Sequence, residues 1–383
     1  MSPRPLRILL VANYVPDAQQ SMKRYAEWLE RSLSARGYEV MVVRPEVYFS
    51  RLSRNPGLSK YLGYIDKFLI FPARLRRLAR TCDLVHVTDH SNSMYLRTVR
   101  ATPCLITCHD LLAIRAARGE FSEVRTGWSG KILQRWILAG LRAAPMVLCV
   151  SAKTASDLRA LAGKTSSEIL VIRSALNWSY RPGGVLSNSL RARLGLDQGK
   201  PYLLHVGGDQ WYKNRPGAVR IFAQLIQLPQ YAALRLVLAG KPWTTEVRAL
   251  VTELGLQNRV LDSVGPDNEE LQALYGNALA LLFPSLEEGF GWPILEAQAC
   301  GCPVITTGCP PMSEVAGDAA IYIDPANPAA AAQVIAEGLV YRERLRAAGF
   351  RNLERFREAD VIDQYCVLYE AAPASPSAPA VRQ

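Results

Sequence analysis

The stretch ALALLFPSLEEGFGWPILEAQACGCPVITT (278–307) holds a complete strand–helix–strand pattern. Its ends, ALALLFP (278–284) and CPVITT (302–307), are apolar runs of the length of a buried strand. Between them, Pro293 suits the first turn of a helix. Strands that are apolar on both faces and joined through a helix predict a parallel sheet covered by helices.

The same alternation runs through the whole chain. Residues 21–36 show a helical pattern that Gly37 ends. The other predicted strands are LRILLVAN (6–13), EVMVVR (39–44), DLVHVT (83–88), PCLITC (103–108), PMVLCV (145–150), EILVIR (168–173), PYLLHVG (201–207), LRLVLAG (234–240), RVLDSVG (259–265) and AIYID (320–324). The sequence therefore predicts an α/β protein of two doubly wound, Rossmann-like domains with parallel sheets facing a central cleft. A cleft of this kind suits an enzyme with two substrates; the alternative is that one of the two sites is redundant.

The domain boundary is predicted within SYRPGGVLSNS (179–189), where Pro, Gly and Ser cluster. The first domain then covers 1–183 and the second 186–348. The small, Pro-rich end at 372–383 is expected to be disordered.

Composition excludes several classes of protein. With 383 residues, 49% hydrophobic and 21% charged, the chain can bury a sizeable core and is not generally disordered. No apolar run approaches the ~20 residues that span a bilayer, and the N-terminus lacks a signal-peptide cleavage pattern. A cytoplasmic location and reduced thiols at the eight cysteines are therefore expected.

Positive charge is concentrated in the first half. Residues 1–185 hold 28 Lys and Arg against 13 Asp and Glu, and residues 186–383 hold 17 against 21. Within residues 51–80, eight basic residues are interleaved with aromatic and apolar ones, including Phe71. This pattern predicts an interfacial amphipathic helix on an anionic membrane surface, supported by Trp128 and Trp136 in a second basic stretch. An ordinary surface helix is the alternative, and nucleic acid is a weaker candidate partner.

Two glutamates flank a glycine-rich loop at the start of the central helix. Glu288 precedes Gly289, Phe290 and Gly291, and Glu296 follows eight residues after Glu288. Helix-start amides attract a diphosphate, and carboxylates accept hydrogen bonds from sugar hydroxyls. The pair could therefore hold both ends of a nucleotide sugar; alternatively, Glu296 only complements the helix dipole and Glu288 is solvated.

The string EEGFGWPILEA (287–297) resembles the Glu-x7-Glu motif of retaining glycosyltransferases of family 4, which have the GT-B fold. HVGGDQWYKNR (205–215), VIRSALNWSYRP (171–182) and LDSVGPDNEELQALYGNALALLFPS (261–285) also resemble family segments. The resemblance covers nearly the whole chain. It implies that the first domain binds the acceptor, the second binds the donor, and a last helix at about 350–371 packs back on the first domain.

The resemblance also implies roles for residues of the second domain. Glu296 would bind the donor ribose and Glu288 the sugar ring, while Gly289, Phe290 and Gly291 would offer backbone amides to the ligand. The remaining expected donor-binding residues are Gly207, Gly208, Lys213 and Arg215. Lys213 would stabilise the departing diphosphate, and Arg215 would replace the arginine that relatives carry soon after the glycine. A solvated loop lysine is the alternative for Lys213.

In the first domain, His109 and Asp110 of CHDLL (108–112) resemble the family's His–Asp site. His109 would contact the donor sugar, and Asp110 would orient it. Asp89 and His90 follow another strand end and are candidates for the acceptor pocket, or for a helix cap involving Ser91. Ser21 and Met22 stand where many relatives carry a double glycine, and are also acceptor candidates.

Other chemistries lack their motifs. The sequence has no Asp-x-Asp, no P-loop and no Gly-x-Gly-x-x-Gly turn after the first strand. Neither a metal nor a cofactor is therefore expected besides a UDP- or GDP-linked sugar as substrate.

The expected function is that of a retaining, metal-independent hexosyltransferase. It would move a mannose- or glucose-type sugar to a saccharide or lipid-linked saccharide in surface polysaccharide biosynthesis. The alternatives are an epimerase or hydrolase of the same fold, and a noncatalytic protein that binds membrane or nucleic acid.

Overall fold

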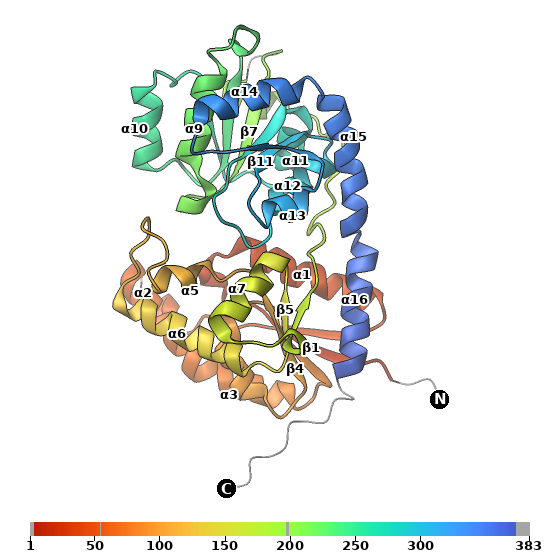
Figure 1. Cartoon of the computed structure of the whole chain (residues 1–383). Helices are drawn as coiled ribbons and strands as arrows, with labels where there is room; N and C mark the ends of the chain where they lie inside the picture. Colours follow the sequence, from red (N-terminus) through yellow and green to blue (C-terminus); the bar gives the residue numbers. More distant parts are fainter. Residues whose placement is uncertain (1–3, 54, 197–198, 373–383) are drawn as a thin grey trace. The chain divides into compact units, whose positions relative to one another are not determined.

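The computed structural model describes residues 4–53, 55–196 and 199–372. They form two compact units (Figure 1). The first unit comprises the chain up to Asn177 together with the residues from Glu358 onward, and the second runs from Trp178 to Arg357. The predicted disordered tail lies, from residue 373 on, outside the described residues.

The first unit is built on a six-stranded parallel sheet with the order β2-β1-β3-β4-β5-β6. Its strands are β1 (Arg7–Val11), β2 (Glu39–Val43), β3 (Leu84–Val87), β4 (Cys104–Cys108), β5 (Val147–Cys149) and β6 (Ile169–Val171). Its helices are α1 (Gln20–Ala35), α2 (Pro56–Ile65), α3 (Phe71–Ala79), α4 (Leu96–Val99), α5 (Leu112–Ala117), α6 (Trp128–Ala143), α7 (Ala152–Ala162) and α16 (Glu358–Ala371). A core of aliphatic side chains fills the face of the sheet beneath α3, α4, α6 and α7.

Helix α16 packs beside α1 on the other face of this sheet (Figure 1). Its Tyr365 hydroxyl lies 2.7 Å from that of Tyr25 on α1. Its Tyr369 hydroxyl lies 2.5 Å from Nδ1 of His86, whose Nε2 lies 2.7 Å from Oγ1 of Thr107. These side chains are buried, so a polar network inside the unit attaches the end of the described chain to strands β3 and β4.

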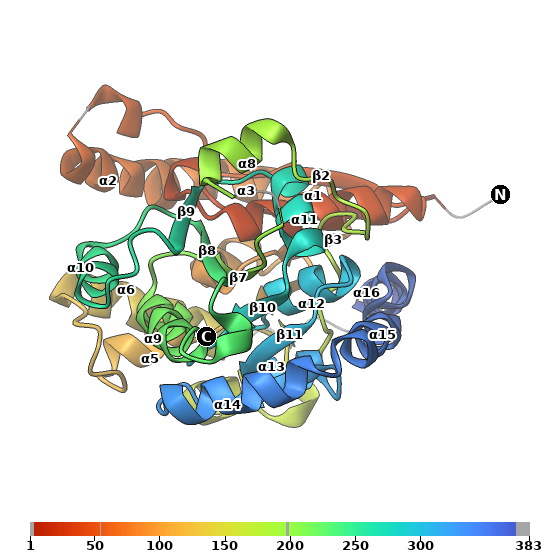
Figure 2. The same cartoon turned by 90° about the horizontal axis from the view of Figure 1, so that it is seen from above.

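The second unit is built on another six-stranded parallel sheet, with the order β12-β11-β10-β7-β8-β9. Its strands are β7 (Tyr202–Gly207), β8 (Arg235–Gly240), β9 (Val260–Val264), β10 (Ala280–Phe283), β11 (Val304–Thr307) and β12 (Ala320–Ile323). Its helices are α8 (Asn188–Leu194), α9 (Arg215–Leu225), α10 (Thr245–Glu253), α11 (Asn268–Asn277), α12 (Trp292–Ala299), α13 (Met312–Ala316), α14 (Pro328–Leu339) and α15 (Arg342–Leu353). Helices α9 and α14 cover one face of the sheet, and α11 and α12 cover the other (Figure 2). Every predicted strand is present, and the doubly wound architecture is confirmed in both units.

The chain passes from the first unit to the second before it reaches the predicted domain boundary. Tyr180 packs edge-on against Tyr275, the Arg181 amide donates to Gln272, and Asn277 donates to the carbonyl of Gly184. These contacts tie residues 178–184 to α11 of the second unit. The final helical stretch also differs, because α15 and α16 are separate helices and only α16 belongs to the first unit.

Candidate functional site

The second sheet reverses its strand order between β7 and β10. These strands are neighbours in the sheet, with Leu204 opposite Leu281, although two strands separate them in the chain. Loops that follow such a pair diverge to opposite sides of the sheet and leave a crevice at the carboxyl ends of the strands, which is where ligands bind in open α/β sheets. The loop after β7 carries Lys213, and the loop after β10 carries Glu288.

Lys213 and Glu288 meet across this reversal point. Nζ of Lys213 lies 2.7 Å from Oε1 of Glu288, and the two side chains are only 15% and 8% exposed. Nζ also lies 5.2 Å from the centre of the Phe283 ring, at the end of β10. The structure therefore brings together two of the predicted donor-site residues as a mostly buried ion pair.

Asn214 holds the two loops in this arrangement. Its backbone is in the left-handed region, at φ 53°, and its side-chain oxygen accepts a hydrogen bond from Gly217 to cap α9. Its Nδ2 donates to the carbonyl of Pro284, at 3.0 Å, and the Leu286 amide donates to Tyr212. Asn214 thus fixes the position of the neighbouring Lys213. Asn214 was not among the predicted site residues, although an Asn before Arg-Pro is a helix-cap signal.

Arg215 has a different environment from the one expected. Its guanidinium is buried and donates to the carbonyls of Gly207, at 2.7 Å, and Lys241, at 2.8 Å. Burial lowers its pKa from the usual value. These bonds occupy the guanidinium in holding the ends of β7 and β8 together, which argues against the phosphate-binding role.

The glycines after β7 lie close to this framework. A Cβ on Gly207 would come within 3.2 Å of the Lys213 side chain, and one on Gly208 within 2.3 Å of Gln210. A larger residue at position 207 would press on the Lys213 side chain, whereas one at position 208 would meet only the flexible end of Gln210, so the small size of Gly207 matters for the position of the cation.

Glu296 is buried on α12 and accepts a hydrogen bond from the Tyr275 hydroxyl at 2.8 Å. Burial and the Glu296 charge raise the pKa of Tyr275 well above its usual value, so the phenol remains a donor at neutral pH. The carboxylate is therefore oriented by a side chain of α11. Tyr275 was not among the predicted site residues, because nothing in the order of residues shows that α11 faces α12.

The glycine-rich loop leads directly into α12. Gly291 caps this helix at φ 102°, a left-handed conformation that favours glycine, and Pro293 lies in the first turn. Phe290 is buried between the rings of Trp292 and Phe356, and Gly289 precedes it. The buried Phe290 fixes the loop, so only its backbone is suited to contact a ligand.

The first sheet reverses its order between β1 and β3, and polar residues gather at the ends of these strands. Asp89 is buried and caps a short 3-10 helix by accepting from the Ser91 amide at 2.9 Å; it also accepts from Nδ2 of Asn13 after β1. Nδ1 of His90 lies 3.1 Å from Asp89. Burial lowers the pKa of His90, but the Asp89 carboxylate outweighs burial and raises it overall. The helix cap is therefore made by the side chain of Asp89 and not by that of Ser91.

His109 follows β4 and is also buried. Its Nε2 donates to the carbonyl of Thr88 at 2.9 Å, and its ring lies edge-on to Tyr25 with centroids 4.7 Å apart. Burial lowers the pKa of His109, which favours the neutral imidazole. Asp110 accepts a hydrogen bond from the Leu112 amide at 3.0 Å, in the turn before α5. Its role in orienting His109 stays a prediction.

A pocket of about 570 Å³ opens on the same side of the first sheet, at the carboxyl ends of its strands. Its lining combines Tyr64, Lys67 and Phe68 from the basic segment with Asn92 and Gln134. Nζ of Lys67 pairs with Asp17 at 3.0 Å and lies 5.3 Å from the centre of the Tyr64 ring. Aromatic and amide groups together suit a saccharide. The sequence analysis did not expect these residues in a binding pocket.

Ser21 and Met22 lie in the first turn of α1 and do not line this pocket. The basic segment is helical but differs in part from the interfacial helix that was predicted. Phe71 is buried in the core and stacks edge-on with Tyr95, so it cannot contact a membrane. Tyr61 and Leu69 are 62% and 72% exposed.

In the described parts of the chain, no helix is long and apolar enough to cross a bilayer. The same residues contain no cluster of His, Cys, Asp or Glu of the kind that holds a metal ion.

Both units match known families. Residues 187–349 match the family described as glycosyl transferases group 1, and residues 22–180 match glycosyltransferase family 4. With the two sheets and the paired loops described above, these matches define a glycosyltransferase-type protein of two Rossmann-like units. The chain belongs to the family 4 type of glycosyltransferases.

Two curated relatives are about 30% identical to this chain over the aligned regions. The O-antigen chain mannosyltransferase B of Escherichia coli is 29% identical over 238 residues, which cover 59% of this chain and 60% of the relative. A D-inositol 3-phosphate glycosyltransferase of Nocardia farcinica is 30% identical over 65% of this chain and 56% of its own length. The chain thus spans less than two thirds of the length of these two relatives.

Solved structures show the same fold over nearly the whole chain. Sucrose-phosphate synthase from Thermosynechococcus elongatus superposes with a TM-score of 0.75 at 19% identity and covers 96% of this chain and 99% of its own. HepE of Anabaena, in complex with UDP and glucose, gives a TM-score of 0.71 at 17% identity, with 96% and 100% covered. The GT-B fold is therefore confirmed.

Proposed function

We propose that this protein is a retaining, metal-independent hexosyltransferase that uses a nucleotide diphosphate sugar. The observation that carries the proposal is the Lys213–Glu288 pair at the strand reversal of the second sheet, beside the start of α12. The cation and the amides at the start of α12 suit the diphosphate of such a donor, and the carboxylates of Glu288 and Glu296 suit the hydroxyls of its sugar and ribose.

Lys213 would contact the diphosphate and stabilise the charge that develops on it as the glycosidic bond breaks. Glu288 would accept hydrogen bonds from the sugar ring, and Glu296, oriented by Tyr275, would accept them from the ribose. Neither carboxylate needs to act as a nucleophile, since the departing phosphate can take the proton of the acceptor hydroxyl on the same face of the sugar. The sugar is proposed to be mannose- or glucose-type, because relatives include mannosyltransferases.

The acceptor is proposed to bind the first unit, in the pocket beside Tyr64 and Lys67. Asp89, His90 and His109 follow the same strand ends as this pocket and are the proposed polar groups nearest to the reacting hydroxyl. A saccharide or lipid-linked saccharide fits the mixed aromatic and polar lining. The process served would be the assembly of a surface polysaccharide.

The decisive experiment measures donor binding and turnover in parallel. A panel of nucleoside diphosphates and UDP- and GDP-sugars, without metal, is screened by thermal shift; a ligand at ~100 times its Kd adds about 2.7 kcal/mol to stability. We expect one base to shift the melting temperature, and Glu296→Gln to abolish that shift. Turnover should fall by at least a hundredfold in Glu288→Gln and Lys213→Ala.

Glu337→Gln is the matched control, because Glu337 is an exposed residue on α14 of the same unit. It should behave as the unchanged protein. Full turnover in all three site variants would refute the proposal. An epimerase or hydrolase would instead consume donor at the same rate with and without acceptor. A noncatalytic binder would keep its affinity in the variants and lose it steeply with salt.

We also propose that the first unit rests on an anionic membrane surface. Trp128 and Ile132 on α6 are 77% and 54% exposed; Leu69 is 72% exposed, and its chain neighbour Phe68 packs on Trp136 of α6. Sedimentation with phosphatidylglycerol vesicles should show binding that Trp128→Ser/Leu69→Ser weakens at least tenfold. Val340→Ser, at an equally exposed position of the second unit, should leave it unchanged; equal binding by all three proteins would contradict the proposal.

A further inference from the structure

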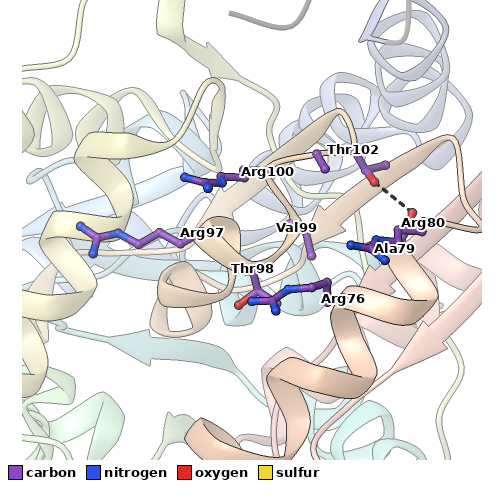
Figure 3. Close-up of a pocket in the computed structure, with 9 residues that line it drawn as sticks. Arg76, Ala79, Arg80, Arg97, Thr98, Val99, Arg100 and Thr102 are labelled. Atoms are coloured by element: carbon purple, nitrogen blue, oxygen red, sulfur yellow. Dashed lines mark hydrogen bonds between the residues drawn. The ribbon is translucent and has the colours of Figure 1, made fainter. Parts of the chain in front are cut away.

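A second polar pocket lies near the amino ends of the strands of the first sheet. It has a volume of about 430 Å³ and is lined by the end of α3, by α4 and by the turn that follows α4. Figure 3 shows Arg76 and Arg80 extending from the α3 side and Arg97 and Arg100 from the α4 side. Thr98 also lines the pocket, and the hydroxyl of Thr102 donates to the carbonyl of Ala79 at 3.0 Å (Figure 3).

These four arginines have no negative partner within the described parts of the chain. None of them makes a hydrogen bond or ion pair with a carboxylate there, and no Asp or Glu lines the pocket. Some other arginines of this unit do have a carboxylate partner, as Arg4 has Asp83 and Arg115 has Glu120. The pocket thus gathers four guanidinium groups around one hollow, and no carboxylate lies among the described residues that line it.

The spacing along the two helices adds a small repulsion between these arginines. Arg76 and Arg80 are four residues apart along α3, and Arg97 and Arg100 are three apart. Like charges at these helical spacings repel and destabilise a helix. Both pairs stand at helix C-terminal ends, which each carry about half a negative charge. That charge accounts for about one arginine in total, so most of the positive charge in the pocket is left without compensation.

The pocket is separate from the proposed catalytic region. Arg80 and Arg100 immediately follow helices that lead into β3 and β4, at the amino ends of these strands, whereas Asp89 and His109 follow the carboxyl ends. These strands have four to five residues, so at ~3.3 Å per residue about 15 Å separates their amino ends from their carboxyl ends. A ligand in the arginine pocket therefore does not occupy the acceptor pocket.

We propose that the arginine pocket is a second anion site, which binds a phosphate-bearing ligand. Guanidinium groups offer paired N–H donors that match phosphate oxygens, and several of them around one pocket favour a group of charge −2 or more. The volume lies within the range of small-molecule sites. The phosphate belongs either to a soluble molecule or to a lipid headgroup, and the two sources are separated by experiment.

The test uses the whole chain and two probes. Inorganic pyrophosphate is titrated calorimetrically, and sedimentation is measured with vesicles of phosphatidylglycerol and phosphatidylcholine against phosphatidylcholine alone. The test variant is Arg76→Gln/Arg97→Gln, which removes one arginine from each helix and leaves the terminal Arg80 and Arg100 in place. The control is Arg31→Gln/Arg159→Gln, which removes the same charge from exposed helical positions of the same unit.

We expect one of the two probes to lose affinity at least tenfold in the test variant and to keep it in the control. Loss of pyrophosphate binding identifies a soluble phosphate ligand; loss confined to anionic vesicles identifies a lipid headgroup. Any pyrophosphate bound near Lys213 is the same in every variant and cancels in the comparison. If test and control variants bind both probes equally, the proposal is overturned. Both variants are expected to fold, because all four substituted side chains are exposed.

Discussion

At the scale of single residues, the ion pair of Lys213 and Glu288 is the most informative feature. Both side chains are largely withdrawn from solvent, so each compensates the charge of the other while no ligand is present. A donor diphosphate would provide a second partner for Lys213, and Glu288 would then be available to the sugar. Under the proposed function, the same pair would hold both side chains in position and would exchange partners when the donor binds.

This exchange leads to a prediction that separates Glu288 from Lys213. Glu288→Gln removes the carboxylate that competes with the diphosphate for Lys213, so the variant should bind the free nucleoside diphosphate at least threefold more tightly while its turnover falls. Lys213→Ala should weaken both. Calorimetric titration of the nucleoside diphosphate, set beside the turnover assay, measures the two effects. Weaker diphosphate binding in Glu288→Gln would show that Glu288 does not compete in this way.

Tyr275 provides a second prediction at this scale. Tyr275→Phe keeps the ring but removes the hydroxyl that donates to Glu296, so the carboxylate loses its fixed orientation. A hydrogen bond to a charged group contributes about 1.5–3 kcal/mol. The donor KM should rise by about three- to tenfold with little change in kcat, because Glu296 is remote from the bond that breaks. Tyr322→Phe, which removes a hydroxyl bonded to Gly317 in the same unit, should leave both constants unchanged.

At the scale of elements, α16 shows how a helix far along the chain completes the first unit. It contributes Tyr365 and Tyr369 to the network around His86 and Thr107, beneath the Tyr25 ring that contacts His109. The hydrogen bond between His86 and Tyr369 joins residues that are 283 positions apart. The helix therefore supports a candidate site residue without lying in the site.

The contribution of α16 to stability can be measured with one hydroxyl. Tyr369→Phe leaves Nδ1 of the buried His86 without its partner, which should lower the free energy of unfolding by about 1–3 kcal/mol. Tyr38→Phe is the control, because Tyr38 bonds Glu370 of the same helix at the surface, where such losses stay within about 0.5 kcal/mol. Urea unfolding of both variants gives the comparison; equal losses would show that the buried network adds nothing beyond a surface contact.

At the scale of the whole molecule, the sequence predicted the features that depend on local patterns. Apolar runs and glycine or proline at their ends are local, so the strands, the doubly wound sheets and the loop from Glu288 to Glu296 could all be located. The partners of these residues depend on contacts between distant segments. That Tyr275 faces Glu296, that Asn214 reaches Pro284 and that Arg215 is bound by carbonyls follows from helix packing and loop paths, for which a single sequence gives no signal.

The same limit applies to the basic segment. Its charge could be counted, but its aromatic residues divide between the core, a pocket and solvent according to the helical turn on which each lies. Phe71 is buried, Tyr64 lines the pocket of the first unit, and Tyr61 is exposed. A composition that predicts a membrane surface therefore also contains core and binding residues, and only the structure separates them.

Each unit contains a buried neutral histidine, which makes the stability of the whole molecule depend on pH. Burial lowers the pKa of His86, in the first unit, and of His205, in the second, to about 3 in each case. The unfolded chain binds a proton at each site near pH 6.5, whereas the folded chain does not, so the unfolded state gains protons first as the pH falls. Stability due to these two residues is therefore complete above about pH 6.5 and decreases between pH 6.5 and 3.

Each of these histidines should lower the free energy of unfolding by about 1 kcal/mol per pH unit in this window. In the first unit, burial also lowers the pKa of His109, whereas the pKa of His90 is raised, so two histidines there act in this direction and one acts against it. Urea midpoints should thus decrease from pH 7 to pH 5 in both units. His205→Gln should flatten this slope in the second unit, whatever its effect on absolute stability, and leave the slope of the first unit unchanged. A slope in the second unit that is the same with and without His205 would mean that this histidine is protonated in the folded state.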